Sequence, residues 1–256
     1  MDHWRIKLAW DGKGFLGWQR QPQGLTIQQA VEEALASVLG GQSVRVTASG
    51  RTDAGVHALC QIASFETDVP RSPKAICLGL NAGLPRQIVC LEAERAPPGF
   101  NARSWSFRKL YRYRILARRV RCPHRDGGVW HVRQPLDVAA MTQAARAIEG
   151  RHDFSSFRAS GCSAAHPVRA IESARVLTVD DELHLEFVGN GFLRHQVRIM
   201  AGTLVHVGTG RIAAERLPDI IAAADRAAGG QTAPPHGLWL VWVESGDGPA
   251  YARKTP

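Results

Sequence analysis

The chain has 256 residues, of which 45% are hydrophobic and 21% charged, as in a soluble globular protein with one large or two ordinary domains. Lysine and arginine outnumber the acids by 32 to 23, giving a formal net charge of +9. This surplus favours a polyanionic partner: nucleic acid, an acidic membrane surface or a phosphorylated ligand. No segment has the length of a signal-peptide core or a membrane span, so we expect neither secretion nor membrane insertion.

The five cysteines are odd in number and scattered, and they form no C-x-x-C motif. This pattern predicts reduced thiols in the cytoplasm rather than a disulfide framework. Cys122 lies near His124, and Cys162 lies near His166, which raises the possibility of zinc. Neither pair has finger-like spacing or a partner pair, so we expect no metal.

In the first part of the chain, residues 4–10 alternate between apolar and polar, which predicts a half-buried strand. The aromatic-rich loop 15–21, which contains Arg20, fits either a packed loop or an RNA-contacting edge. Thr26 and Ser72 are placed as N-caps of two helices. The expected helices cover 27–38 and 74–81, and the expected strands cover 4–10, 44–48, 59–65 and 87–94. Their alternation, with hairpin-like links, favours an antiparallel α+β layer.

A Pro/Gly-rich linker at 96–99 separates the first part from the second. Beyond it we expect strands over 104–116, 168–179, 183–188 and 238–243, and helices over 137–149, over 192–207 and from about 218. The predicted domains are therefore 1–103 and 104–245, followed by a flexible tail over 246–256.

Residues 103–133 form the most basic segment, with ten Lys or Arg and one acid, Asp126. Along the strand predicted there, one face carries aromatic residues such as Tyr111 and Tyr113, and the other carries arginines such as Arg112 and Arg114. A run of charged residues most often forms a solvent-exposed face, but arginines interleaved with aromatic residues fit a nucleic-acid-binding surface better.

The stretch Gly50-Arg51-Thr52-Asp53-Ala54-Gly55-Val56-His57-Ala58 links two predicted strands and is the strongest motif in the chain. Two glycines allow unusual backbone angles and the close approach of a ligand. Between them lie a guanidinium, a hydroxyl and a carboxylate, with an imidazole just beyond. A polar turn in which Asp53 and Thr52 bond to nearby backbone is the simpler interpretation.

This stretch resembles the active-site loop of the tRNA pseudouridine synthase A family. The resemblance continues, in the family's order, over residues 4 to about 243. Its further landmarks are Gly17-Trp18-Gln19-Arg20-Gln21, Leu110-Tyr111-Arg112-Tyr113, Asp153-Phe154-Ser155-Ser156-Phe157-Arg158, Gly191-Phe192-Leu193-Arg194-His195-Gln196-Val197-Arg198 and Gly237-Leu238-Trp239-Leu240. Arg194 and Gln196 depart from the family's pattern, which often has an aromatic or His, and Met, at these two positions; this could alter how RNA is held.

The resemblance implies an α+β fold of two similar, mainly antiparallel layers with helices on the outer face, flanking a basic RNA-binding cleft. It implies that Asp53 is the catalytic aspartate, that Arg198 pairs with it, and that Tyr111 packs on the target uracil. Arg51 would enter the RNA in place of the displaced nucleotide. Further substrate contacts are expected from Arg20, His57, Arg112 and Arg194.

The implied reaction isomerises uridine to pseudouridine at tRNA nucleotides 38, 39 and 40, in the anticodon stem-loop. It breaks the bond from C1′ to N1, turns the uracil over and joins C1′ to C5. No redox change occurs, so no cofactor is expected, and the sequence contains no P-loop or dinucleotide motif. Asp53 could act as a nucleophile at the sugar or ring, or as a base at C2′. The family also implies a cytoplasmic homodimer that acts on tRNA and not on DNA.

Two other functions compete with this one. The first is a hydrolase that uses Asp53, His57 and a metal ion on a phosphorylated substrate, and chelation would inactivate it. The second is a non-catalytic RNA-binding module in which Asp53 only structures its loop. The number of family landmarks in order favours the synthase over both.

Overall fold

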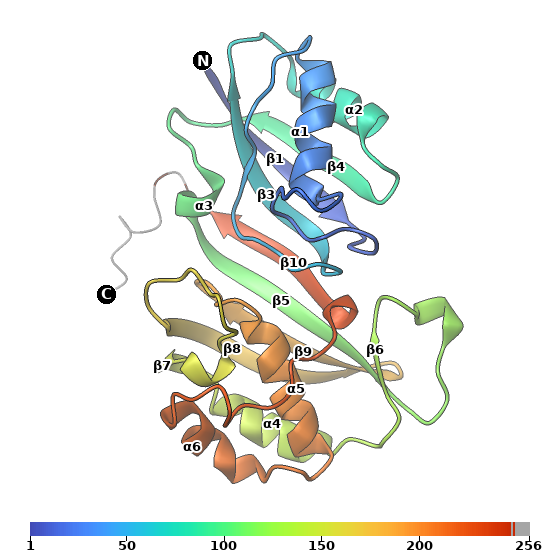
Figure 1. Ribbon diagram of the computed structural model, residues 1–256, viewed down its shortest axis with the longest axis vertical. Coiled ribbons are helices and arrows are strands. Elements are labelled where there is room, and N and C mark those ends of the chain that lie inside the picture. The colour runs from blue at the N-terminus through green and yellow to red at the C-terminus, as the bar shows by residue number, and fades with distance from the viewer. Residues whose placement is uncertain (247, 249–256) are drawn as a thin grey trace. The chain divides into compact units, whose positions relative to one another are not determined.

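A computed structural model describes residues 1–246 and 248 of the chain (Figure 1). The chain divides into two compact units, one formed by Met1–Phe107 with the segment from Leu240 onward and the other by Arg108–Trp239. Each contains mainly antiparallel strands and helices, so the predicted α+β fold class is confirmed. The domain boundary near residue 103 and the basic cleft stay predictions.

The first unit has strands in the order β4-β1-β3-β10. Strand β1 is antiparallel to both β4 and β3, and β2 pairs with β3 in the antiparallel direction as well. Helices α1 and α2 pack on each other, and α2 packs on β4 (Figure 1). The strands are β1 (Asp2–Trp10), β2 (Thr47–Ala48), β3 (His57–Thr67), β4 (Ile88–Arg95) and β10 (Leu238–Ser245), and the helices are α1 (Ile27–Val38), α2 (Pro73–Gly83) and α3 (Ala102–Trp105).

The alternation of apolar residues along β1 explains the core of this unit. Trp4, Ile6 and Leu8 are fully buried, whereas the intervening side chains are partly exposed. Both predicted N-caps are confirmed, because the Thr26 hydroxyl accepts a hydrogen bond from the backbone N–H of Gln29, and the Ser72 hydroxyl accepts one from Ala75. The caps therefore fix where α1 and α2 begin.

Two predicted strands, β2 and β5 (Ser106–Ala117), need correction. Only Thr47 and Ala48 of the strand expected over 44–48 form β2. Side chains of α1 take the place of a strand partner at Val46: Glu32 accepts from its N–H (3.1 Å) and Gln28 donates to its carbonyl (3.1 Å). The strand expected to begin at residue 104 begins at Ser106, because the Asn101 side chain caps the short helix α3.

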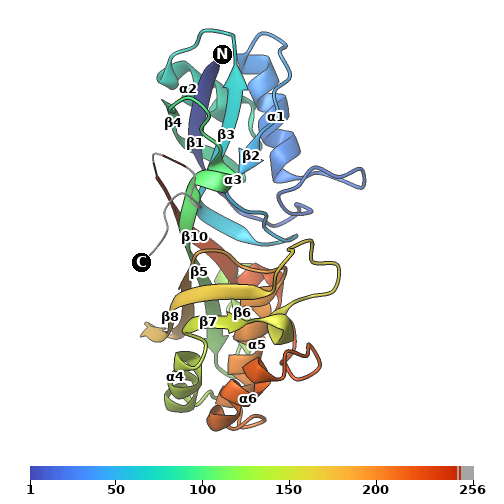
Figure 2. The same ribbon diagram turned by 90° about the vertical axis from the view of Figure 1, so that its left-hand side faces the viewer.

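The second unit has antiparallel strands in the order β5-β9-β8-β7, and β6 joins β5 in parallel. Figure 2 shows that α4, α5 and α6 lie together, below β7 and β8 in that view. The strands are β5 (Ser106–Ala117), β6 (Trp130–Val132), β7 (Gly150–Asp153), β8 (Val168–Val179) and β9 (Glu182–Gly189). The helices are α4 (Val138–Arg146), α5 (Gln196–Gly208) and α6 (Leu217–Ala222), with single 3₁₀ turns η1 (Pro123–Arg125), η2 (Ser155–Phe157), η3 (Ala214–Arg216) and η4 (Pro235–Gly237).

Both longer helices of the second unit are shorter than predicted. Asp137 caps α4 as expected, but the helix ends at Arg146 and not at Glu149. Helix α5 begins at Gln196 and not at Phe192, since His195 adopts a left-handed backbone conformation (φ 60°) and the Gln196 side chain accepts from the N–H of Leu193. The predicted strand pair over 168–179 and 183–188 is confirmed. The acidic residues Asp180, Asp181 and Glu182, hereafter the acidic turn, join the two strands.

Among the described residues, no helix combines the length and the apolar character needed to cross a membrane. The predicted tail over 246–256 lies, apart from Gly246 and Gly248, outside the described residues.

Candidate active site

The loop that carries Asp53 is fastened to the segment between β1 and α1. The N–H of Trp18 donates to the carbonyl of Thr52 (3.1 Å), and the N–H of Gly55 donates to the carbonyl of Phe15 (3.3 Å). At the end of the loop, the indole N–H of Trp10 donates to the carbonyl of Val56 (3.0 Å). The backbone on both sides of Asp53 is therefore fixed, while the residue itself is partly exposed.

Two glycines allow this close approach of two backbone segments. A Cβ on Gly17 would lie 2.6 Å from the carbonyl oxygen of Thr52, and one on Gly12 would lie 2.3 Å from that of Val56. Gly17 also has a left-handed conformation (φ +87°) that side chains rarely adopt. The sequence placed Gly17 in a family landmark but did not indicate its contact with the Asp53 loop.

The other predicted residues of the first unit have different environments. Arg51 is exposed on the same loop as Asp53. His57 is 1% exposed; its Nδ1 accepts from the N–H of Gly12 (3.1 Å) and lies 3.1 Å from an oxygen of Asp11. Arg20 forms an ion pair with Glu32 (3.0 Å) on α1. Arg51 and Asp53 thus lie on one loop, and His57 begins the strand that follows it, β3. The guanidinium of Arg20, in contrast, is bound to Glu32 of α1.

In the second unit, Tyr111 lies on β5 with its ring almost fully buried. Phe192 packs edge-on against it, with ring centroids 5.1 Å apart. Arg112, the next residue on β5, forms an ion pair with Glu186 on β9 (2.7 Å), so its guanidinium already has an acidic partner.

Arg198 lies in the first turn of α5 and is fixed by two bonds to the same residue. Its Nε donates to the carbonyl of Ala233 (2.8 Å), and its own carbonyl accepts from the N–H of Ala233 (3.1 Å). Arg194, just before α5, is exposed, and its guanidinium donates to the carbonyl of Ser160 (3.2 Å). The pairing of Arg198 with Asp53, which belong to different units, stays a prediction.

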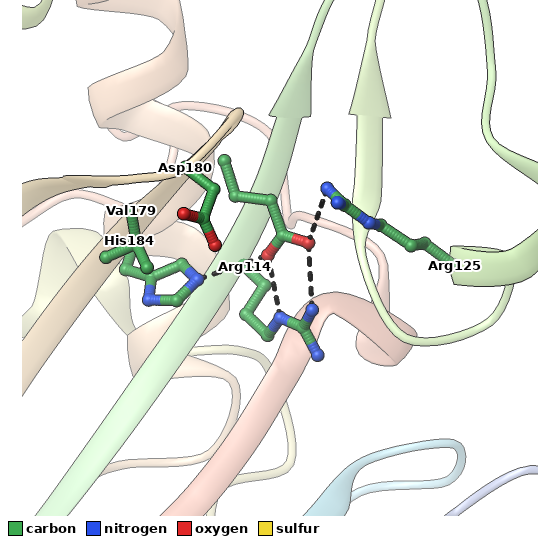
Figure 3. A pocket seen from close by; sticks show the side chains of 6 residues that line it. Arg114, Arg125, Val179, Asp180 and His184 are labelled. Atoms are coloured by element: carbon green, nitrogen blue, oxygen red, sulfur yellow. Dashed lines mark hydrogen bonds and ion pairs between the residues drawn. The ribbon is translucent and has the colours of Figure 1, made fainter.

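The acidic turn between β8 and β9 binds several arginines of the basic segment. Glu182 is almost fully buried, and its carboxylate lies 2.8 Å from Arg114, 3.1 Å from Arg125 and 3.1 Å from His184. Figure 3 shows these three basic side chains around the pocket that they line with Asp180. Asp181 pairs with Arg125 and also with Arg118 (3.3 Å). These contacts connect β5 and the loop after it to the hairpin of β8 and β9. They involve Arg114, Arg118 and Arg125, which are three of the ten cationic side chains in residues 103–133.

Burial pushes the pKa of Glu182 upward, but this effect is outweighed. Hydrogen bonds from Arg114 and His184, with the charges of Arg114 and Arg125, hold the pKa of Glu182 below its usual value. Burial, in contrast, is the main cause of the lowered pKa of His184. The carboxylate therefore stays charged where it holds the basic loop.

Within residues 1–246 and 248, no three His, Cys, Asp or Glu side chains form a group that could hold a metal ion. Cys162, one of the cysteines considered for zinc, accepts a hydrogen bond from the N–H of Arg194 (3.5 Å). Burial raises the pKa of this thiol, but backbone N–H groups and Arg158 lower it by more. Cys162 is thus part of the loop that packs against Arg194.

Comparison with protein families gives a match over most of the chain. A family model described as tRNA pseudouridine synthase matches residues 8–103 and 144–244. These ranges contain the Asp53 loop and the Arg198 helix, but not Tyr111.

Individual relatives extend the match to nearly the full length. Proteins named tRNA pseudouridine synthase A from Syntrophotalea carbinolica, Acidiphilium cryptum and Rhodospirillum rubrum are 46%, 44% and 47% identical to this chain. The alignments cover 93%, 95% and 95% of this chain and 94%, 96% and 87% of those proteins, respectively. A solved archaeal box H/ACA Nop10–Cbf5 complex aligns with 78% of this chain and 53% of its own, at 11% identity; its TM-score of 0.31 is too low to support an argument.

Proposed function

The chain belongs to the tRNA pseudouridine synthase A family, whose members isomerise uridines of tRNA, and we propose that this chain does so at nucleotides 38, 39 and 40 of the anticodon stem-loop. The observation that carries the proposal is the Asp53 loop, which combines the family's motif with a backbone fixed on both sides and partial exposure of Asp53. Preorganised catalytic groups of this kind lower the barrier because no reorganisation is needed during the reaction.

In the proposed mechanism, Asp53 acts on the uridine as a nucleophile at the sugar or ring, or as the base that removes the C2′ proton. Arg198 supplies a positive charge that favours the ionised carboxylate. Tyr111 offers a flat face to the uracil. Its packing against Phe192 supports this role, because a ring held edge-on keeps its orientation when the base enters.

The target base must leave its stack, which costs a few kcal/mol. Arg51 is exposed beside Asp53, and we assign it the role of filling the space left by the extruded nucleotide. Arg20, His57, Arg112 and Arg194 are proposed to support substrate binding. The ion pairs of Arg20 and Arg112 and the burial of His57 favour indirect roles for these three, in which they shape the surface that meets RNA.

We also propose that the protein works in the cytoplasm as a homodimer, with one tRNA contacting both subunits. The rival hydrolase and the non-catalytic RNA-binding module predict no pseudouridine. The hydrolase also predicts inactivation by chelators, whereas the isomerisation has no step that needs a Lewis acid.

The test is incubation of the purified protein with unmodified tRNA, followed by mapping of pseudouridine at each position. Conversion is expected at nucleotides 38, 39 and 40, and it should be lost when these uridines are replaced by cytidine. Pretreatment of the enzyme with a chelator, before it meets tRNA folded in Mg²⁺, should leave the rate unchanged.

Asp53→Asn is the matched enzyme control. It should abolish conversion while preserving tRNA affinity, because phosphate contacts and RNA shape dominate binding. Conversion by Asp53→Asn at the wild-type rate would remove Asp53 from the mechanism, and modification confined to other tRNA positions would refute the proposed specificity.

A further inference from the structure

The orientation of Arg198 depends on a short segment that follows α6 in the chain. Arg198 bonds to Ala233 through both its side chain (2.8 Å) and its backbone carbonyl (3.1 Å). The bond from Nε fixes the rotation of the guanidinium plane about its last side-chain torsion. Ala233 is fully buried, so this contact is made inside the second unit.

One end of this segment is fixed by close packing on α5. A Cβ on Gly202 would lie 1.9 Å from the carbonyl oxygen of Gln231, and one on Gly230 would lie 2.7 Å from the Cα of Thr203. The hydroxyl of Thr203 also accepts from the N–H of Gly230 (2.9 Å). The backbone that leads to Ala233 therefore has little freedom to move along α5.

The other end contains Pro234 and Pro235, which have no backbone N–H and cannot be held by N–H bonds. The hydroxyl of Tyr113 on β5 donates to the carbonyl of Pro234 at 2.7 Å. The Tyr113 ring is fully buried, and Gly237 leaves room for it, because a Cβ there would lie 2.8 Å from the ring. Burial raises the pKa of Tyr113 far above its ordinary value, against a lowering effect of Arg198, so the hydroxyl stays protonated and keeps donating.

We infer that Tyr113 is a positioning residue for catalysis, whose hydroxyl holds the Ala233–Pro234 backbone where it orients the Arg198 guanidinium. The inference rests on the proposed function, in which Arg198 acts on the reacting carboxylate. Tyr113 itself, buried two residues beyond Tyr111, does not touch the uracil in this scheme.

The first test compares Tyr113→Phe with the wild type in single-turnover reactions at saturating tRNA. Phenylalanine keeps the buried ring and removes only the bond to Pro234. Because small displacements of catalytic groups are costly, we expect the rate to fall by about ten- to a hundredfold while tRNA affinity stays within about twofold.

Ser156→Ala is the control, since it also removes a buried hydroxyl of the same unit, one that donates to the carbonyl of Ile220 (2.6 Å) and accepts from the N–H of Asp225 (3.0 Å). It should lower the unfolding midpoint without slowing the reaction. If Tyr113→Phe folds poorly, Gly237→Ala tests the same contact, because its methyl group would displace the Tyr113 ring. This variant should also lower the single-turnover rate.

A double-mutant cycle separates positioning from a general structural effect. In an Arg198→Lys background, where the bond from Nε is absent, Tyr113→Phe should cause no further slowing. Full additivity of the two changes, or a wild-type rate for Tyr113→Phe, would overturn the inference. A slow Arg198→Lys beside a normal Tyr113→Phe refutes only this inference, whereas a normal Arg198→Lys refutes the proposed role of Arg198 as well.

Discussion

At the scale of single residues, the Asp53 loop depends on a glycine that no side chain can replace. Gly17→Ala would place a methyl group 2.6 Å from the carbonyl oxygen of Thr52 and force a side chain into a left-handed conformation. The conformational strain alone costs about 1–2 kcal/mol. The steric clash must be relieved by movement of the Asp53 loop, so we expect turnover to fall by roughly a hundredfold as well.

Gly14→Ala separates these two effects. Gly14 has nearly the same conformation (φ +84°), but a Cβ there would meet nothing within 4 Å. It should therefore lose stability to a similar strain while keeping nearly normal turnover. Denaturant unfolding and single-turnover rates of both variants make the comparison, and equal rates for the two would show that the contact with Thr52 does not position Asp53.

Single residues also show which contacts could not be predicted from the sequence. The family resemblance proposes Asp53, Arg51 and Arg198 as site residues, because each lies in a contiguous stretch with a family pattern. It does not indicate that the indole of Trp10 bonds to Val56, or that Tyr113 bonds to Pro234, since these partners are 46 and 121 residues apart. Side-chain bonds to distant backbone have no periodicity that a sequence could display.

At the scale of elements, the acidic turn between β8 and β9 restrains the basic loop that follows β5. Glu182→Gln should destabilise the protein by roughly 1–3 kcal/mol near neutral pH, because it weakens the hydrogen bonds from Arg114 and removes the ion pair with Arg125 at a buried site. Denaturant unfolding of the variant and the wild type measures this difference, and an unchanged free energy of unfolding would contradict it.

The pH dependence of this contribution has a defined sign. The folded-state pKa of Glu182 lies below its ordinary value of 4.5, so its stabilisation is present above that pH and is lost as the pH falls through the lowered pKa. Wild-type stability should therefore decrease more steeply than that of Glu182→Gln below about pH 4.5. Asp219→Asn, which alters an exposed ion pair with Arg216, should keep the wild-type slope.

The elements that were predicted well are those with strong local signals. Alternation predicted β1, and side-chain caps predicted the start of α1, α2 and α4. The two strands expected on either side of an acidic turn are β8 and β9. The errors arise where distant or specific side chains override local pattern, as when Glu32 and Gln28 replace a strand partner at Val46. Likewise, the left-handed His195 delays α5 although the apolar pattern begins earlier.

At the scale of the whole molecule, the chain returns at its end to the unit in which it began. The segment from Leu240 onward belongs with Met1–Phe107, and the strand order of that unit places β10 beside β3. Arg5 on β1 also donates to the hydroxyl of Ser245 (3.2 Å). Nothing in the apolar run 238–243 indicates which strand will be its neighbour, so this pairing could not be predicted from sequence.

The net charge of +9 is also a property of the whole molecule, and the arginines at the end of β5 and in the loop after it have two different environments. Arg114, Arg118 and Arg125 are bound to carboxylates of the acidic turn. Arg119 and Arg121 are exposed on the loop that this turn restrains. We therefore expect Arg119 and Arg121, and not Arg118, to provide most of the phosphate contacts of this loop.

The prediction is that the double variant Arg119→Gln/Arg121→Gln binds tRNA more weakly and with a flatter salt dependence. Each lost phosphate contact removes about 0.7–0.9 from the slope of log K against log salt, so the double variant should lose roughly 1.5. Turnover at saturating tRNA should hardly change, because these contacts stabilise the bound ground state and the transition state alike. Lys74→Gln/Arg86→Gln removes the same charge from exposed positions around α2 and should keep the wild-type slope. An equal loss of slope in both double variants would mean that total charge, and not the loop after β5, governs binding of tRNA.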